Sequence, residues 1–147
     1  RFEDSVLDRN PHYIIVCFGI NDSWVDDSLT SLSRIPLHRY KENLTHFIEE
    51  GGQSSQVLLL SPNALGDRYA RWRKKRLKKY ELVCRRLARE YQLPFLNGRK
   101  LFLQGSRRQG KPVDALLLDG VHPNDAGHEL VAEELFLKIQ HHLAIQK

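Results

Sequence analysis

The chain has 147 residues, of which 41% are hydrophobic and 28% are charged, so its composition is that of a folded domain and not of a disordered segment. A chain of this length buries roughly 68–70% of the surface that its unfolded form exposes, and its core therefore needs no disulfide or metal. No apolar run approaches the ~18 residues of a membrane-spanning helix, which excludes a membrane span.

The start of the chain and its cysteines bear on the cellular setting. The sequence contains no methionine and begins with Arg1, so we expect further residues upstream in the intact protein, where a signal peptide can stand. Cys17 and Cys84 lie in apolar segments without the spacing of metal ligands, which predicts two buried free thiols. Free thiols favour a reducing compartment such as the cytoplasm, but the compartment stays open.

The first half of the chain alternates between strand and helix signals. The apolar run Tyr13–Phe18 predicts a central parallel strand covered on both faces, which ends at Gly19. After a polar loop, Pro36 begins a helix that the pair Gly51-Gly52 ends. The inward positions of this helix recur at helical spacing: Leu37, Tyr40, Leu44, Phe47 and Ile48. The run Val57–Leu60 predicts a second buried strand.

The second half continues the alternation. A long helix follows, and its apolar stripe consists of Tyr69, Trp72, Leu77, Tyr80, Val83, Cys84, Leu87 and Tyr91. Pro94–Leu96 predicts a short third strand, and the stretch 97–114 is expected to be a loop with one helical turn at Lys100–Leu103. Pro123 and Asn124 then begin the last helix, with Asn124 as its cap. The buried face of this helix consists of Leu130, Val131, Leu135, Ile139 and Leu143.

Strands separated by helices predict a single α/β domain with a parallel sheet and helices on its faces. Ligands of such sheets bind at the carboxyl ends of the strands, and functional residues are expected there. Two polar clusters fit this expectation. Gly19–Asp22 follows the first strand, and Asp119–Pro123 precedes the last helix.

These two clusters contain the candidate catalytic residues. Asp119 and His122 are three positions apart in a predicted turn, where the carboxylate can fix the imidazole tautomer and stabilise the imidazolium. Asn21 follows a buried strand, where its side-chain amide can donate to an oxyanion. Each pattern alone is also common in turns without any catalytic role. Their occurrence together favours the catalytic interpretation.

The same segments resemble the SGNH, or GDSL, hydrolases. The residues Phe18-Gly19-Ile20-Asn21-Asp22 resemble the third block of that family, and Leu118–Asn124 resembles its fifth block. Ile35–Leu44 and Val57–Pro62 are similar to the next helix and strand in the isoamyl acetate-hydrolysing esterase-like branch. The resemblance implies a three-layer α/β/α, flavodoxin-like domain over residues 1–147. It also implies that Asn21 belongs to the oxyanion hole, and that Asp119 and His122 are catalytic.

The chain departs from the family pattern at its beginning. The family's Gly-Asp-Ser block, with the nucleophilic serine, and its second-block glycine have no counterpart here. Ser5 follows neither a strand nor a glycine, and we place it on the exposed side of a short helix whose inward residues are Phe2 and Val6. The N-terminal strands of the fold are therefore expected to be absent from this chain. Either the intact protein is longer or the chain is a non-catalytic remnant.

If the missing segment exists, the resemblance implies a serine hydrolase that acts on short acyl esters. His122 would act as general base and acid, Asp119 would orient it, and Asn21 would bind the oxyanion. The expected partner is a small-molecule ester, and no metal or organic cofactor is needed. Trp24 and Val25 are candidates for lining the acyl pocket, with a role in the core as the alternative. Among the other histidines, His128, His141 and His142 are assigned to surface or helix-end positions.

One charged run supports a different class of function. Between Asp67 and Tyr91 there are eleven Lys and Arg residues against three acidic residues, a balance of +8, so the rest of the chain sums to −3 within the total of +5. The densest part, Arg73–Lys79, is typical of surfaces that bind nucleic acid or acidic partners. We favour the interpretation that these cations are the solvated side of an amphipathic helix, with a binding module as the alternative.

Overall fold

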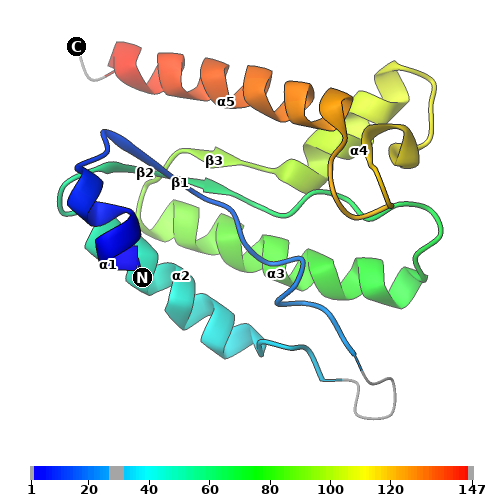
Figure 1. Cartoon of the computed structure of the whole chain (residues 1–147), viewed down its shortest axis with the longest axis horizontal. Coiled ribbons are helices and arrows are strands. Elements are labelled where there is room, and N and C mark those ends of the chain that lie inside the picture. Colours follow the sequence, from blue (N-terminus) through cyan, green and yellow to red (C-terminus); the bar gives the residue numbers. More distant parts are fainter. Residues whose placement is uncertain (1, 27–31, 146–147) are drawn as a thin grey trace.

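The computed structural model describes residues 2–26 and 32–145 and contains a three-stranded parallel sheet between two layers of helices (Figure 1). The strands are β1 (Tyr13–Val16), β2 (Gln56–Leu60) and β3 (Phe95–Leu96), in that spatial order. The longer helices are α2 (Leu37–Gly51), α3 (Arg71–Glu90), α4 (Gly98–Arg108) and α5 (Asp125–Ile145). The short helical pieces are α1 (Phe2–Ser5), η1 (Leu7–Arg9) and η2 (Val113–Leu116). The predicted α/β fold with a parallel sheet is confirmed.

Strand β2 lies between β1 and β3, and its side chains alternate between the two faces of the sheet. Val57 and Leu59 pack with α2 and α3, whereas Leu58 and Leu60 pack with α4 and α5. All four side chains are buried. Because successive residues of a strand face opposite sides, a continuous apolar run is what a strand covered on both faces requires.

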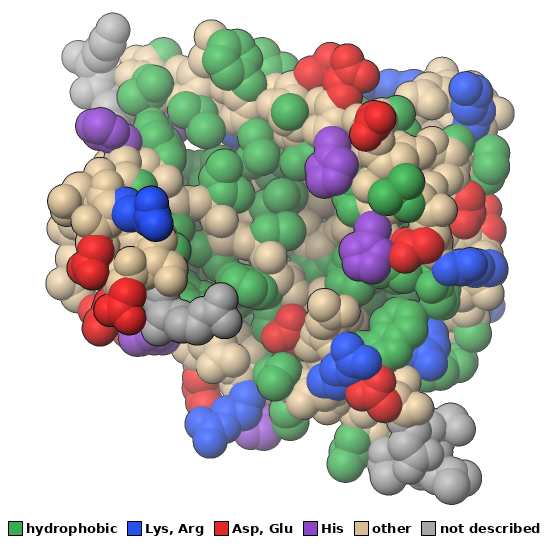
Figure 2. Space-filling model, in the orientation of Figure 1, with side chains coloured by type: hydrophobic (Ala, Val, Ile, Leu, Met, Phe, Trp, Pro, Cys, Tyr) green, Lys and Arg blue, Asp and Glu red, His purple; other side chains and the backbone are tan. Residues whose placement is uncertain are grey.

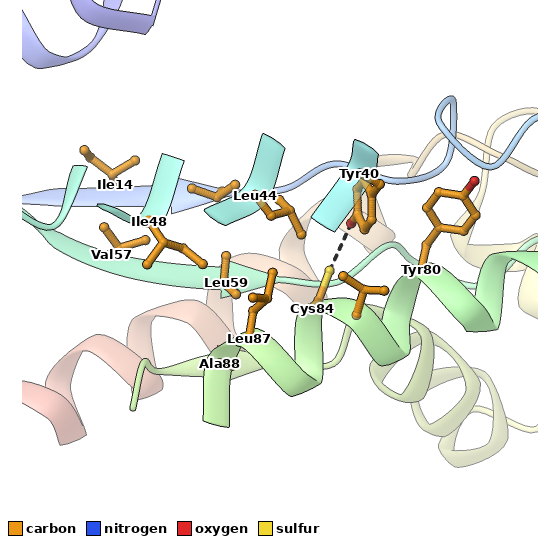
Figure 3. Close-up of a cluster of buried hydrophobic side chains, with 12 residues drawn as sticks. Ile14, Tyr40, Leu44, Ile48, Val57, Leu59, Tyr80, Cys84, Leu87 and Ala88 are labelled. Atoms are coloured by element: carbon orange, nitrogen blue, oxygen red, sulfur yellow. Dashed lines mark hydrogen bonds between the residues drawn. The ribbon is translucent and has the colours of Figure 1, made fainter. Parts of the chain in front are cut away.

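The core between the sheet and the helices α2 and α3 also fixes the end of β1 (Figure 3). The Tyr40 hydroxyl donates to the Phe18 carbonyl at 2.9 Å and lies 3.0 Å from Cys84 Sγ. A hydroxyl has only one hydrogen, so the Cys84 thiol is the donor in the second contact. Burial raises the pKa of the Cys84 thiol to about 11, which keeps this donor protonated. The segment that follows β1 is thereby anchored to both helices.

Helix α5 begins where the sequence predicts. The Gly127 amide donates to the Asn124 side chain at 3.0 Å, which confirms Asn124 as the cap. The residues of α5 that pack against the sheet are Leu130, Val131, Leu135 and Ile139. Leu143 is 46% exposed and Trp72 of α3 is 43% exposed, so the prediction that these two side chains face inward is wrong. The guanidinium of Arg73 lies over the Trp72 ring instead, 4.6 Å from its centroid.

The prediction that β1 is a central strand covered on both faces is wrong for the described chain. Strand β1 pairs only with β2, and in residues 2–26 and 32–145 no strand lies along its other edge. Ile15 is 43% exposed, Phe18 is 51% exposed, and Cys17 is an exposed thiol instead of a buried one. The physical reason is that α4 and α5 pack over β2 and β3, whereas no helix of the described residues covers the Ile15 side of β1.

A further correction concerns the stretch 97–114, where most of the expected loop is the helix α4. The Asn97 side chain caps this helix by accepting from the Lys100 amide at 2.9 Å. Its glycines mark close packing and not a loop, because a Cβ at Gly105 would lie 2.7 Å from the Leu130 side chain. The polar composition of α4 reflects its position at the surface of the domain.

The remaining sequence expectations concern the two ends of the chain and the first polar loop. Ser5 is exposed and Phe2 and Val6 pack against the core, as predicted. Residues 27–31 of the expected polar loop lie outside the described residues. No helix in the described part of the chain is both long and apolar enough to cross a membrane.

Candidate active site

The turn before α5 brings Asp119 and His122 together. Asp119 Oδ2 lies 2.7 Å from His122 Nδ1, and Asp119 Oδ1 accepts from the amides of Val121 at 2.9 Å and His122 at 2.8 Å. Gly120 has φ +76°, a left-handed conformation that favours glycine and lets the turn fold back on the carboxylate. The turn therefore holds the Asp119 carboxylate against the imidazole with three contacts.

These contacts also determine the charge of Asp119. The amide of His122, then its imidazole, and then the Val121 amide lower the pKa of Asp119 well below its usual range. An ionised carboxylate bonded at Nδ1 leaves Nε2 of His122 as the free ring nitrogen and stabilises an imidazolium when Nε2 takes a proton. The His122 side chain is 68% exposed in this chain, so Nε2 is open to a reacting group.

The loop between β2 and α3 holds this turn in place. Asn63 Nδ2 donates to the Val121 carbonyl at 2.9 Å, and the Gly66 amide donates to the Gly120 carbonyl at 2.8 Å. The Arg68 guanidinium donates to the Asp119 carbonyl. Sequence reasoning missed Asn63 and Arg68. The position of Asn63, just after a buried parallel strand, is the signal that could have found it, whereas no local pattern indicates Arg68.

Asn21 lies in the tight turn that follows β1. The Ser23 amide donates to the Gly19 carbonyl at 3.0 Å, and the Trp24 amide donates to the Asn21 carbonyl at 3.1 Å. The Asn21 side chain is exposed and lines a cavity of about 170 Å³. The other lining residues are Cys17, Phe18, Gly19, Ile20, Asp22, Pro62 and Asn63. Gly19, with φ +126°, is required here because a Cβ would lie 2.6 Å from the Pro62 ring.

A small hydrophobic cluster connects the two loops. Buried Leu65, Leu77 and Val121 form its centre, and Ile20 packs against them. Ile20 precedes Asn21 and Val121 precedes His122, so the cluster fixes both candidate groups at the same edge of the sheet. Asn63 contacts both loops, because it lines the cavity beside Asn21 and its side chain donates to the Val121 carbonyl.

The surroundings of Trp24 and Val25 differ from those expected for side chains that line an acyl pocket. Val25 is 2% exposed, and Trp24 packs against the Leu65 cluster with its ring 5.7 Å from that of Tyr69. Neither side chain lines the cavity beside Asn21. Asp22 accepts from the Ile35 amide through its main-chain carbonyl at 3.1 Å, a contact that braces the loop.

Comparison with known proteins defines the class to which the chain belongs. Residues 1–130 match the model of the GDSL-like lipase/acylhydrolase family. The chain is therefore a member of this family, as its two motif blocks predict.

Two curated proteins resemble it in sequence. The chain is 25% identical over 150 residues to the GDSL esterase/lipase At5g45920 of Arabidopsis thaliana, covering 89% of this chain and 59% of that protein. A stretch of 51 residues is 43% identical to the uncharacterized lipoprotein YqeF of Bacillus subtilis, covering 34% of this chain and 20% of YqeF.

Solved structures share the fold. Axe2, an acetylxylan esterase from Geobacillus stearothermophilus, is 23% identical and gives a TM-score of 0.80, covering 95% of this chain and 64% of its own. LAE5, an α/β hydrolase enzyme from the metagenome of Lake Arreo in Spain, gives a TM-score of 0.78 at 23% identity, covering 94% and 64%. The chain thus spans less than two thirds of the length of these relatives.

Proposed function

We propose that this chain supplies the Asn, Asp and His of a serine ester hydrolase whose nucleophile lies in a segment outside residues 1–147. The observation that carries the proposal is the Asp119–His122 pair, 2.7 Å apart and held by the β2–α3 loop, in a member of a lipase/acylhydrolase family. The isoamyl acetate-hydrolysing branch remains a prediction from the sequence alone.

The proposed reaction assigns one role to each of these groups. His122 Nε2 takes the proton of the serine hydroxyl as its oxygen attacks the ester carbonyl, and Asp119 stabilises the resulting imidazolium. The Asn21 amide donates to the oxyanion of the tetrahedral intermediate. His122 then returns the proton to the leaving alcohol, and water releases the acid from the acyl-enzyme by the same two steps.

The uncovered edge of β1 suggests where the nucleophile enters the fold. This edge has no partner strand in the described residues, and Ile15 and Phe18 are exposed beside it. Figure 2 shows a hollow in this view of the molecule, below α5, with hydrophobic side chains in it. We propose that a strand of the intact protein pairs with β1 here, which would place its carboxyl end near Asn21.

The names of the relatives support an ester substrate. Structures of Axe2 include catalytic mutants in which a serine, an aspartate or a histidine is replaced by alanine, and the last two are three positions apart. Asp119 and His122 have the same separation in this chain. We propose a short acyl ester as the substrate class, as the resemblance to the family implies.

The test is hydrolysis of p-nitrophenyl acetate by the full-length protein and its His122→Ala variant. We expect His122→Ala to reduce kcat by several orders of magnitude, since the members of a catalytic triad act as a unit. His128→Ala, an exposed histidine in the first turns of α5, is the matched control and should keep normal turnover. Wild-type turnover in a folded His122→Ala protein would contradict the mechanism.

A further inference from the structure

A second cavity lies between α3 and α4 and contains none of the candidate catalytic residues. We call it the α3–α4 pocket; its volume is about 230 Å³. Its apolar lining consists of Ala64, Leu65, Leu77, Leu103 and Val113. Its charged lining consists of Asp67, Arg71, Lys74, Lys75, Lys78 and Arg99. The pocket thus combines a hydrophobic floor with five cations and one carboxylate.

Most of this positive charge is not neutralised by other described residues. Lys74 pairs with Asp67 at 3.4 Å, and Arg99 pairs with the buried carboxylate of Glu81. No hydrogen bond or ion pair to Arg71, Lys75 or Lys78 occurs among the described residues. Within the part of the chain that the structure describes, three cations of the pocket therefore have no counter-charge.

The position of these cations on the helix makes their charge unfavourable in the free protein. Helix α3 begins at Arg71, has no acidic residue in its first turn and has no side-chain cap. Cations near a helix N-terminus oppose the helix dipole. Arg71 and Lys75, and likewise Lys74 and Lys78, are also like charges four residues apart, a spacing at which they repel each other. A bound anion would relieve both effects.

We propose that the α3–α4 pocket binds a small anion with a short apolar chain, such as a carboxylate or phosphate with an alkyl group. The head group would lie among Arg71, Lys75 and Lys78, and the chain would contact Leu77 and Leu103. A dry cavity of roughly 150 Å³ accommodates benzene, so a pocket of about 230 Å³ can take a chain of comparable size together with its head group.

The combination of both kinds of lining distinguishes this ligand from a polyanion such as nucleic acid. A polyanion would use the exposed cations of α3 irrespective of the cavity and would gain nothing from a buried floor. Here the floor residues Leu77 and Val113 are almost fully buried, 2% and 6% exposed, and the half-buried Leu103 beside them is the lining side chain that an alkyl chain would contact most. The chain length of the ligand is therefore expected to affect its affinity.

The test measures binding to the full-length protein by titration calorimetry and thermal unfolding. The probes are hexanoate and hexyl phosphate, which separate the two head groups, together with hexan-1-ol and inorganic phosphate, which lack the charge or the chain. We expect saturable binding and a higher Tm with at least one of the first two, and at least tenfold weaker binding of the last two. Equal affinity for hexan-1-ol, or for inorganic phosphate, would overturn the proposal.

Two variants locate the site. Lys75→Gln combined with Lys78→Gln should weaken binding about tenfold, because two head-group contacts are lost. Lys79→Gln combined with Arg86→Gln removes two exposed cations of α3 that do not line the pocket, and it should leave binding unchanged. Equal losses in the two pairs, or displacement of the probe by a single-stranded oligonucleotide regardless of its alkyl chain, would show a general basic surface instead.

Filling the pocket provides an independent test. Leu103→Phe adds volume at a half-buried lining position and should abolish the preference for hexanoate or hexyl phosphate over inorganic phosphate. Retention of that preference in a folded variant would contradict the proposal. All of these measurements can be repeated in the His122→Ala background, so their outcome does not depend on the proposed ester hydrolysis.

Discussion

At the scale of single residues, Asp119 has the most constrained side chain of the candidate site. One oxygen of its carboxylate receives two main-chain amides and the other contacts the imidazole of His122. Each contact favours the ionised form, and this has consequences for both turnover and stability.

The first consequence concerns the imidazole tautomer. In Asp119→Asn the amide oxygen can keep the two main-chain bonds, but the amide nitrogen then faces Nδ1 and leaves the hydrogen on Nε2. We expect a folded full-length variant whose kcat for p-nitrophenyl acetate falls roughly 10³–10⁴-fold. Asp125→Asn, at an exposed position of the first turn of α5, is the control. A loss of less than tenfold in Asp119→Asn would show that the carboxylate does not orient His122.

The second consequence is a pH dependence of stability. The pKa of Asp119 is lower in the folded chain than in the unfolded chain, where it is about 3.9. Its contribution to stability is therefore complete above the unfolded pKa and is lost as the pH falls through the folded one. We expect the urea midpoints of the unmodified protein and Asp119→Asn to converge as the pH falls from about 5 to 2. Midpoints that diverge over this range would contradict the shift.

The role of Asn21 can be tested by removing its amide donor in two ways. Asn21→Asp keeps the shape of the side chain but replaces the N–H groups with a negative charge, which repels an oxyanion. We expect kcat to fall by about 10²–10³ or more with little change in KM, since the donor matters chiefly when charge develops. Asn21→Ala should give a similar loss without the added repulsion. An unaltered kcat in both variants would remove Asn21 from the oxyanion hole.

At the scale of elements, α4 shows why a polar segment can escape sequence reasoning. Its start depends on Asn97, whose side chain accepts from Lys100 and also donates to the buried Glu81 carboxylate at 2.7 Å. Glu81 is 1% exposed and also bonds Arg85 and Arg99. These contacts join α4 to α3, but no local pattern in the sequence indicates them.

Asn97→Ala removes both contacts at once. We expect a loss of about 2 kcal/mol in the free energy of unfolding, from the missing cap and from the unpaired part of a buried carboxylate. Urea unfolding measures this difference. Gln104→Ala, at an exposed position of the same helix, should change stability by less than about 0.5 kcal/mol. Similar effects of both substitutions would mean that the Asn97 contacts contribute little.

The elements that sequence reasoning found are those whose signals are local. Helix α2 shows its apolar spacing and its limits at Pro36 and Gly52, and β2 is a continuous apolar run. The Asp119–His122 pair also depends on a single turn. In contrast, the exposure of β1 depends on its neighbours in the sheet, and the role of Arg68 depends on a contact with Asp119, 51 positions away. A local sequence pattern contains no information about contacts between residues that are so far apart in the chain.

At the scale of the whole molecule, β1 has one edge that no strand of the described residues pairs with. An unpaired strand with exposed apolar side chains is a template for association with another chain. We expect the isolated 147-residue chain to self-associate, to hydrolyse no p-nitrophenyl acetate, and to become more monomeric in Ile15→Lys.

The same substitution should act oppositely in the full-length protein. If further residues of the intact protein cover both the edge of β1 and its Ile15 face, Ile15→Lys buries an unpaired ammonium group and lowers Tm, whereas Lys41→Gln, at an exposed position of α2, does not. Analytical ultracentrifugation and thermal unfolding measure the two effects. A monodisperse isolated chain, or a full-length Ile15→Lys protein with unchanged Tm, would show that this edge needs no cover.

The way in which the β2–α3 loop holds the Asp119–His122 turn determines which sequence changes the site can accept. The Gly66 amide meets the Gly120 carbonyl, and the Asp67 amide meets the Asp114 carboxylate at 2.6 Å. Both of these donors are main-chain amides of the loop. Their positions therefore depend on the number of residues after β2 more than on the identity of the side chains. Exchanges of residue type in this loop are restricted at Asn63, whose side chain bonds the Val121 carbonyl, and at Gly66, where a Cβ would collide with the Asp114 carboxylate. A deletion or insertion of one residue between Ser61 and Gly66 would displace both main-chain donors and release the turn.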